Sequence, residues 1–583
     1  MGISFKFRAS FDPFVCTCCA CIKFAFDILD EYLEMVAEDR LGLVTDDEDD
    51  EQFEEGNIFY EPDSLIQQQA SPGLLYLASV SAAIGGVIFG YDVGVIAGAR
   101  SQVAQEMALT CTQEELLVSL MPLGAVSSSL VSGRLMDGLG RRVTIQLTCL
   151  VFLAGSGLMS LSSGLGLLLL GRFLVGAGVS LSAISESCYI SEIATATNRG
   201  RLVSLNELGI TIGFLLAFIV DYTFMDMTSG WRLMFGLSGG MAAIQLVLIS
   251  FMPETPHFLV LSGRDLKAIA VMKKIHNIGG VLAQREVDKI KAEQKLERDH
   301  SCSFVCSSED NMRSRLMVGL GLVIGQQLSG QPNVMTYAGD IAQAVGFCGS
   351  TLSALATIIL GLVKVIATLA SLLLVDRLGR RTLLLMGVAT IGVSLAVLTV
   401  TATYQEVHEG VAHQACREYQ NVSETESVTM SAECPPSPLP RHASIISFIA
   451  LVTYITAYSV SFGPISWILL SELFPLGVKA RAMSLGQAVN WTANVVVSFT
   501  FLDMVHTFTL PSVFGFYLVM SGVSFFFIYY YVPETKNRTL EEINCELRQD
   551  RNTRHKTLSP LPAVKRSTAI TQQRSMPLQV IQT

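Results

Sequence analysis

Five ionisable side chains lie within long apolar stretches of this sequence, where charges are otherwise rare. They are Asp92, Arg172, Glu186, Glu207 and Lys364. An isolated charge in hydrocarbon is costly, so ionisable residues in such positions usually face a polar pathway, pair with one another or relay protons. Their positions therefore predict polar sites inside an otherwise apolar protein, although the sequence alone assigns no role to Glu186.

Two neighbouring amide side chains, Gln326 and Gln327, begin the segment Gln-Gln-Leu-Ser-Gly. Amides both donate and accept hydrogen bonds, as the hydroxyls of a polyhydroxylated ligand do, so such a pair is suited to binding that kind of compound. Hydrogen bonding between neighbouring helices is the alternative. Because the sequence contains no HExxH motif, paired metal-ligand cluster or nucleophile–base arrangement, we expect no enzymatic activity, no metal and no cofactor.

The composition indicates what positions these residues. Hydrophobic residues make up 50% of the 583, and the mean hydropathy is +0.46. Charged residues make up 16%, against about a quarter in ordinary soluble domains. These values exclude a soluble globular protein, a disordered chain and a disulfide-rich secreted scaffold. Of the net charge of −11, residues 1–70 carry −13 and the rest +2. We therefore predict an all-α membrane protein that lies in the lipid bilayer and has no nucleic-acid partner.

Twelve apolar runs are long enough to cross a bilayer, which takes about twenty helical residues. The predicted spans are 74–98, 115–136, 143–163, 165–190, 202–221, 232–252, 316–338, 350–375, 382–403, 444–470, 482–503 and 511–532. Basic residues gather in every second connection, and the positive-inside rule places those connections and both termini in the cytoplasm. We expect a multi-pass protein of the plasma membrane or an endomembrane.

The predicted spans divide the chain into five parts. These are an acidic, mostly disordered cytoplasmic segment (1–70), a six-helix bundle (71–252), a cytoplasmic linker with amphipathic helices (253–315), a second six-helix bundle (316–532) with an external loop at 404–443, and a cytoplasmic tail (533–583). Asn421 begins an Asn-Val-Ser sequon in the external loop, which predicts N-glycosylation there.

Motifs of the first bundle recur in the second. The triplet Pro-Glu-Thr at 253–255 recurs 280 residues later at 533–535, and DGLGRR at 137–142 recurs 239 residues later as DRLGRR at 376–381. The two offsets differ by 41 residues, close to the length of the external loop. We therefore predict two pseudo-symmetric halves, the second with one insertion.

The repeated segments combine acids with arginines beside tight turns. Arginines in this position can bond helix C-terminal carbonyls and carboxylates on neighbouring helices. We expect gating ion pairs that form when the cytoplasmic side closes and break when it opens; simple cytoplasmic anchoring of the loops is the alternative. The residues expected to take part are Asp137, Arg141, Arg142, Glu192, Arg199, Asp376, Arg380, Arg381, Glu472 and Lys479.

Several segments together resemble one known family. The GRR turns, GRFLVGAG at 171–178, PETPHFL at 253–259, QQLSG at 326–330 and VPETK at 532–536 are similar to the sugar porter family of the major facilitator superfamily. The resemblance covers about residues 71–545. It implies the major facilitator fold with twelve transmembrane helices. It also implies a monomeric unit that transports a monosaccharide, a hexose such as D-glucose, by alternating access.

The resemblance also implies which residues bind the sugar. By the family pattern they are Gln326, Gln327, Asn333, Trp467, Trp491 and Asn494. The tryptophans would place an apolar ring against the sugar, with anchoring at the bilayer interface as the alternative. One acidic residue, Glu207, and one basic residue, Lys364, stand where the familiar glucose uniporters have amides. Glu207 is thus either a sugar ligand or a second proton site.

Proton coupling is left open by the same resemblance. Asp92 matches the span-one aspartate of proton-coupled sugar porters, and Arg172 matches its span-four partner. If rocking of the halves changes their separation, Asp92 binds a proton in one state and releases it in the other. The alternatives are a permanent ion pair in a facilitative uniporter, and a sensor that keeps the transporter fold without useful flux.

Overall fold

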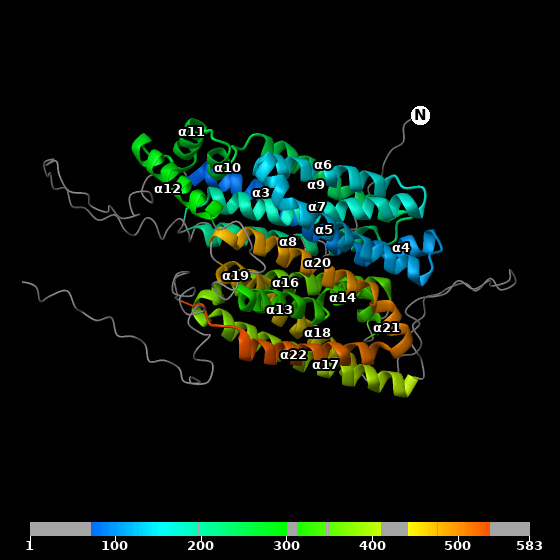
Figure 1. Cartoon of the computed structure of the whole chain (residues 1–583). Coiled ribbons are helices and arrows are strands. Elements are labelled where there is room, and N and C mark those ends of the chain that lie inside the picture. Colours follow the sequence, from blue (N-terminus) through cyan, green and yellow to red (C-terminus); the bar gives the residue numbers. More distant parts are fainter. Residues whose placement is uncertain are drawn as a thin grey trace, which may run out of the picture. The chain divides into compact units, whose positions relative to one another are not determined.

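A computed structural model of the chain describes residues 72–195, 198–299, 312–344, 347, 349–409, 441–474 and 476–536. Within helices, the side chains of 72, 199–201, 293–299, 344, 376, 405–409, 441 and 476–481 are not described. The acidic segment 1–70, the sequon at Asn421 and the tail from residue 537 lie outside the described residues. Every regular element of the described part is a helix (Figure 1).

The first half contains seven helices for six predicted spans, because α4 continues α3 after a turn at Val95. Their bounds are α3 Pro72–Gly94, α4 Ile96–Glu106, α5 Cys111–Leu139, α6 Arg141–Ser160, α7 Leu165–Ile193, α8 Arg199–Phe224 and α9 Gly230–Ser250. Helix α3 packs on α8, and α7 packs on α5 and α6. The core of this half is built from apolar side chains such as Tyr91, Phe152 and Trp231.

Three helices follow α9 before the second half begins. They are α10 Pro256–Leu261, α11 Asp265–His276 and α12 Gly280–Asp299. They pack on one another through Leu259, Ala268 and Val287, with their charged side chains on the outside. Burial lowers the pKa of His276 at the end of α11, so this side chain favours its neutral form.

The second half begins with a discontinuous helix. Its elements are α13 Met312–Leu328, α14 Gln331–Thr336, α15 Ala338–Ala344, α16 Ser350–Leu378, α17 Arg380–Glu409, α18 Arg441–Val460, α19 Phe462–Leu473, α20 Leu476–Phe499, α21 Phe501–Phe508 and α22 Leu510–Tyr531. Helix α17 packs on α18 and α22. The two halves meet where α5 packs on α20 and α8 packs on α16 (Figure 1).

Eleven helical segments of the described chain are long and apolar enough to cross a membrane. The predicted span at 316–338 differs, because its helix is interrupted after 17 residues. Large apolar side chains point outward from the spans, including Leu130 and Val393, each 67% exposed, and Val400, 68% exposed. Such surfaces are stable against lipid tails rather than water, which agrees with the predicted membrane protein.

Candidate functional site

The interruption of the seventh predicted span places two amide side chains at the end of a helix. Helix α13 ends at Leu328, and Gly330 adopts φ +87°, a left-handed conformation that favours glycine. A Cβ there would lie 2.7 Å from Cγ of Tyr517, so any side chain would also collide with this ring. The freed carbonyl of Ser329 accepts a hydrogen bond from the Tyr454 hydroxyl at 3.0 Å. The break is thus built into the sequence and satisfied by its neighbours.

Gln327 is the centre of an amide network between α13 and α20. Its Nε2 donates to Oδ1 of Asn490 at 2.5 Å, and its Oε1 accepts from Nδ2 of Asn494 at 3.1 Å. Gln326, one residue earlier, donates to the carbonyl of Phe462 at 3.0 Å, which lies at the start of α19. The structure therefore brings together two of the predicted ligands, Gln327 and Asn494, whereas the Gln326 amide bonds the backbone of α19 instead.

Asn490 completes this network and was not among the residues predicted from the sequence. It lies one helical turn before Asn494, so both side chains fall on the same face of α20. That spacing, two amides four residues apart in an apolar run, was the available signal.

Asn333 occupies a different position from the other amides. Its Nδ2 donates to the carbonyl of Val497 at 2.9 Å and to the Tyr517 hydroxyl at 2.8 Å, and the residue is fully buried. These bonds fix α14 against α20 and α22. The Asn333 side chain thus holds the broken helix in place beside the network.

The two predicted tryptophans differ in their surroundings. Trp491 is 5% exposed and lies 5.9 Å from Phe89 of the first half, measured between ring centroids. It belongs to the apolar cluster of the first half although it lies on α20 of the second. Trp467 on α19 is half-buried. Trp491 thus contributes an aromatic surface at the contact between the halves, next to the amide network on the same helix.

Glu207 and Lys364 face each other across the contact between α8 and α16. The two side chains attract each other electrostatically, and the Lys364 ammonium lies 3.6 Å from the centroid of the Phe214 ring. Lys364 is 7% exposed. Phe214 follows Glu207 by two helical turns on the same face of α8. Among the described contacts, the buried lysine thus has the Phe214 ring as its neighbour and the electrostatic attraction of Glu207, but no carboxylate in an ion pair with it.

Asp92 and Arg172 are neighbours, but their side chains do not bond each other among the described contacts. Arg172 donates from Nη1 to the backbone carbonyl of Asp92 at 3.3 Å and from Nε to the carbonyl of Leu117 at 3.4 Å. The Asp92 carboxylate accepts from the Ser238 hydroxyl at 2.9 Å instead. Both residues are almost completely buried. The expected proximity is present, with Ser238 as an additional partner that the sequence did not indicate.

Glu186, which received no role from the sequence, lies in the interior of the first half. Its carboxylate accepts from the Gln245 amide at 2.9 Å, and Gln245 also donates to the carbonyl of Ala82 at 3.4 Å. A Cβ on Gly85 would overlap the Glu186 carboxylate, so this glycine leaves the room for it. The contacts give Glu186 a place in the packing of α3, α7 and α9.

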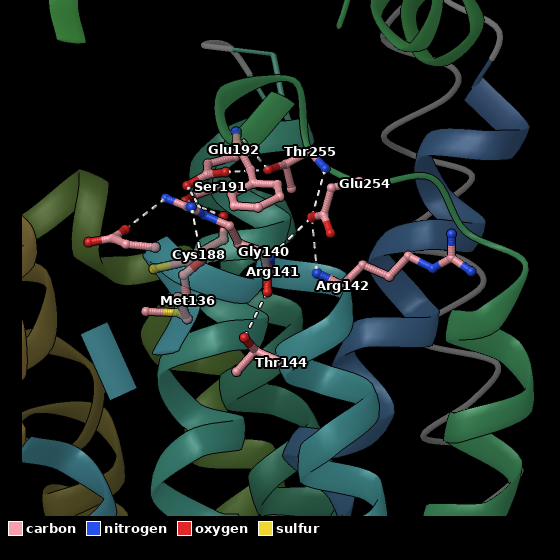
Figure 2. Close-up of polar contacts among 12 residues, drawn as sticks. Met136, Gly140, Arg141, Arg142, Thr144, Cys188, Ser191, Glu192, Glu254 and Thr255 are labelled. Atoms are coloured by element: carbon pink, nitrogen blue, oxygen red, sulfur yellow. Dashed lines mark hydrogen bonds and ion pairs between the residues drawn. The ribbon is translucent and has the colours of Figure 1, made fainter. Parts of the chain in front are cut away.

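We call the repeated Asp-x-x-Gly-Arg-Arg segments at 137–142 and 376–381 the two basic turns. In the first of them, several hydrogen bonds and ion pairs connect the same few residues (Figure 2). Arg141 Nε donates to Glu192 at 2.9 Å, and its Nη2 lies 3.8 Å from Asp137. Glu254 accepts from the backbone N–H groups of Arg141 and Arg142 at 3.1 and 3.0 Å, which are otherwise unpaired at the start of α6. Arg142 donates to the carbonyl of Ser250 at the end of α9.

The second copy repeats these bonds at equivalent positions. Arg380 lies 3.3 Å from Glu472, and Glu534 accepts from the backbone N–H groups of Arg380 and Arg381 at 3.0 and 3.1 Å. Arg381 donates to the carbonyl of Tyr529 at 2.6 Å. The acids of the two Pro-Glu-Thr triplets were not among the predicted gating residues, although their repetition marked them. The triplet threonines also correspond, because Thr255 and Thr535 donate to Glu192 and Glu472, each at 2.6 Å.

The described ion pairs of the two basic turns each lie within one half. Arg141 and Glu192 join α6 to α7, and Arg380 and Glu472 join α17 to α19. The side chains of Arg199, Asp376 and Lys479 lie outside the described part. In this structure the turns therefore tie helices together inside each half. Burial raises the pKa of Glu254, and the backbone N–H donors of Arg142, Thr255 and Arg141 oppose that shift.

The chain is similar to known transport proteins over most of its length. Residues 78–547 match the family described as "Sugar (and other) transporter". Human solute carrier family 2, facilitated glucose transporter member 12 is 34% identical over 529 residues, which cover 81% of this chain and 85% of the relative. Human facilitated glucose transporter member 10 is 34% identical over 532 residues, covering 83% and 95%.

Solved structures show the same fold. The xylose transporter XylE from E. coli, in a partially occluded inward open conformation, superposes with a TM-score of 0.65 at 24% identity and covers 80% of this chain and 100% of its own. The proton:xylose symporter XylE bound to 6-bromo-6-deoxy-D-glucose gives a TM-score of 0.66 at 24% identity, covering 82% and 99%. The predicted major facilitator fold is confirmed.

Proposed function

The chain belongs to the sugar transporter family of multi-pass membrane proteins, and from that premise we propose that it carries hexoses, D-glucose among them, by alternating access. The halves at 71–252 and 316–532 rock about a site between them. The proposed ligands are the predicted amides and tryptophans, together with Glu207 on α8. Its relatives are transporters rather than enzymes.

The amide network beside Trp491 is the observation that carries this proposal. Gln327, Asn490 and Asn494 bond one another, and Trp491 on the same helix contacts Phe89 of the other half. A sugar that enters exchanges these amide–amide hydrogen bonds for amide–hydroxyl ones, so the polar groups stay paired throughout binding. Contacts of α20 with both halves also let a bound sugar influence how the halves pack.

The proposed orientation places α10–α12 and both termini in the cytoplasm and the connection after α17 outside, where Asn421 carries a glycan. Positive-inside charge supports this arrangement. We propose a plasma-membrane location and a monomeric transport unit.

Facilitative uniport and proton symport make different use of Asp92. In symport the Asp92 carboxylate releases its bond from Ser238 and exchanges a proton as the helices around Arg172 shift. In uniport the same groups keep one arrangement throughout the cycle. The structural neighbour XylE is a proton:xylose symporter, which supports the first use.

Hexose uptake into proteoliposomes tests the proposal. The wild type is expected to equilibrate radiolabelled D-glucose, and Gln327→Ala is expected to lower the initial rate about tenfold or more, because at least one buried polar partner is lost. The exposed Gln284 on α12, which bonds only Asp288 in the described contacts, gives the matched control Gln284→Ala with unchanged uptake.

The same vesicles separate the alternatives. Accumulation above equilibrium under an imposed pH gradient, lost in Asp92→Asn, establishes symport, and equilibration that ignores the gradient establishes uniport. Binding of D-glucose without flux would instead establish a sensor. Equal uptake by Gln327→Ala and wild type would contradict the proposed site.

A further inference from the structure

The two halves are joined by charged contacts at the end of the bundle that carries α4 and α21 (Figure 1). This end lies opposite α10–α12 and is external in the proposed orientation. No sequence motif indicates a role for it. The contacts come from α4 and α5 of the first half and from α15 and α21 of the second.

Arg100 on α4 is the centre of these contacts. Its guanidinium forms ion pairs with Glu114 on α5, in its own half, and with Asp340 on α15, in the other half. The same guanidinium lies 4.6 Å from the centroid of the Tyr337 ring. Arg100 is 5% exposed, so its charge depends on these partners rather than on water.

A second connection runs beside the first. Glu115, the neighbour of Glu114 and 1% exposed, accepts from the backbone N–H of Asp503 in α21 at 3.0 Å. The Tyr337 ring stacks on Phe501 of the same short helix at 4.5 Å between centroids. The two adjacent acids of α5 therefore serve different partners, one through Arg100 and one directly in the second half.

The broken helix links this end to the amide network. Gln327 lies at the end of α13, and Tyr337 and Asp340 follow on the segment that begins beyond the break at Gly330. In the described part of the chain, Arg100–Asp340 joins the halves, whereas the ion pairs of the two basic turns stay within one half. Any movement that separates the halves at the external end must break Arg100 from Asp340 and Tyr337.

We propose that Arg100, together with Asp340, Tyr337 and the Glu115–Asp503 contact, forms an outer gate that holds the external end closed. The inference rests on the proposed alternating access and adds the residues that control its external step. Glu114 keeps Arg100 in position in both states, because the two share one half. Opening then costs the bonds to the second half only, and the arginine remains paired.

Hydrogen–deuterium exchange of the full chain in lipid nanodiscs tests the gate. When exchange is limited by a rapid opening equilibrium, its rate follows the population of the open state. Asp340→Asn is expected to raise exchange in peptides of α4, α15 and α21 by about 1.5- to fivefold, the range that measured exposed ion pairs correspond to. Arg100→Gln removes the ion pairs with Glu114 and Asp340 and the contact with the Tyr337 ring, so a larger increase in exchange is expected. Asp340→Glu keeps the charge and should return exchange toward wild type.

Arg232→Gln is the matched control. Arg232 lies at the same end, pairs with Glu106 at 3.7 Å and donates to the carbonyl of Ser160 at 3.2 Å, all within the first half. Its loss should leave exchange of α15 and α21 unchanged. An equal increase in Arg232→Gln and Asp340→Asn would overturn the gate, because the effect would then reflect general loosening.

Sugar uptake by the same variants separates this inference from the proposed function. Hexose flux in the wild type with unchanged exchange in Asp340→Asn refutes the gate and keeps the transporter. Raised exchange in Asp340→Asn with no flux of any hexose in the wild type shows that these contacts hold the external end closed, but refutes the transport proposal. Asp340 is half-exposed, so its replacement is expected to leave the protein folded.

Discussion

Replacing Gly140 by alanine tests whether the two basic turns are built alike. Gly140 has φ +96° and ψ 163°, a backbone region that is essentially confined to glycine. A Cβ there would lie 2.6 Å from Glu254 Oε2 and 2.7 Å from Phe258 Cε1. The backbone conformation alone costs alanine about 1–3 kcal/mol, and the displaced Glu254 would also lose bonds to the start of α6.

The second copy and a nearby glycine provide the comparison. Gly379 has φ +95°, and a Cβ there would lie 2.8 Å from Glu534 Oε2, so Gly379→Ala should have a similar effect. Gly138, two residues before Gly140, lies inside α5, and a Cβ added there would meet no atom within 4 Å. Alanine at this position should stabilise the helix by up to about 1 kcal/mol.

Thermal unfolding of the purified protein in detergent measures these differences. Gly140→Ala and Gly379→Ala should lower the midpoint, whereas Gly138→Ala should leave it unchanged or raise it. Equal midpoints for Gly138→Ala and Gly140→Ala would refute the reasoning, because the two sites differ in conformation and contacts rather than in chemistry.

Three further changes have defined outcomes. Burial raises the pKa of Glu254 above its ordinary value, so the stability that Glu254 contributes is present at low pH and is lost as the pH rises through the raised value. Glu254→Gln should remove this part of the pH dependence of the unfolding midpoint. A pH profile that Glu254→Gln leaves unaltered would contradict this expectation. Tyr454→Phe removes the bond at the helix break and should cost about 1 kcal/mol, whereas Tyr530→Phe, 71% exposed, should leave the unfolding midpoint unchanged. Ser238→Ala should change the pH dependence of hexose uptake if Asp92 exchanges protons, and an identical pH profile would favour uniport.

Residue types and the family resemblance together selected part of the site. The paired glutamines lie in an apolar run and are buried, and the bond of Gln327 to Asn494 is an interhelical hydrogen bond, the alternative that the sequence left open beside sugar binding. The repeated turns form equivalent bonds in both halves. The described pairs of these turns lie within the halves, so they do not show the contact between halves that would close a gate. Sequence repetition shows that two segments share a structure, but it carries no information on whether a bond lies within a half or between halves.

The sequence by itself determined the helical membrane class, nearly all of the spans and the internal repeat. These properties depend on the length, polarity and order of local segments, which the bilayer and the backbone fix without reference to distant residues. Only the tertiary structure decided the partners: Asn490 for Gln327, Ser238 for Asp92, and Asp340 for Arg100, 240 residues away. Partners of this kind are chosen by how helices far apart in the chain pack, and a polar side chain in an apolar run is compatible with many of them.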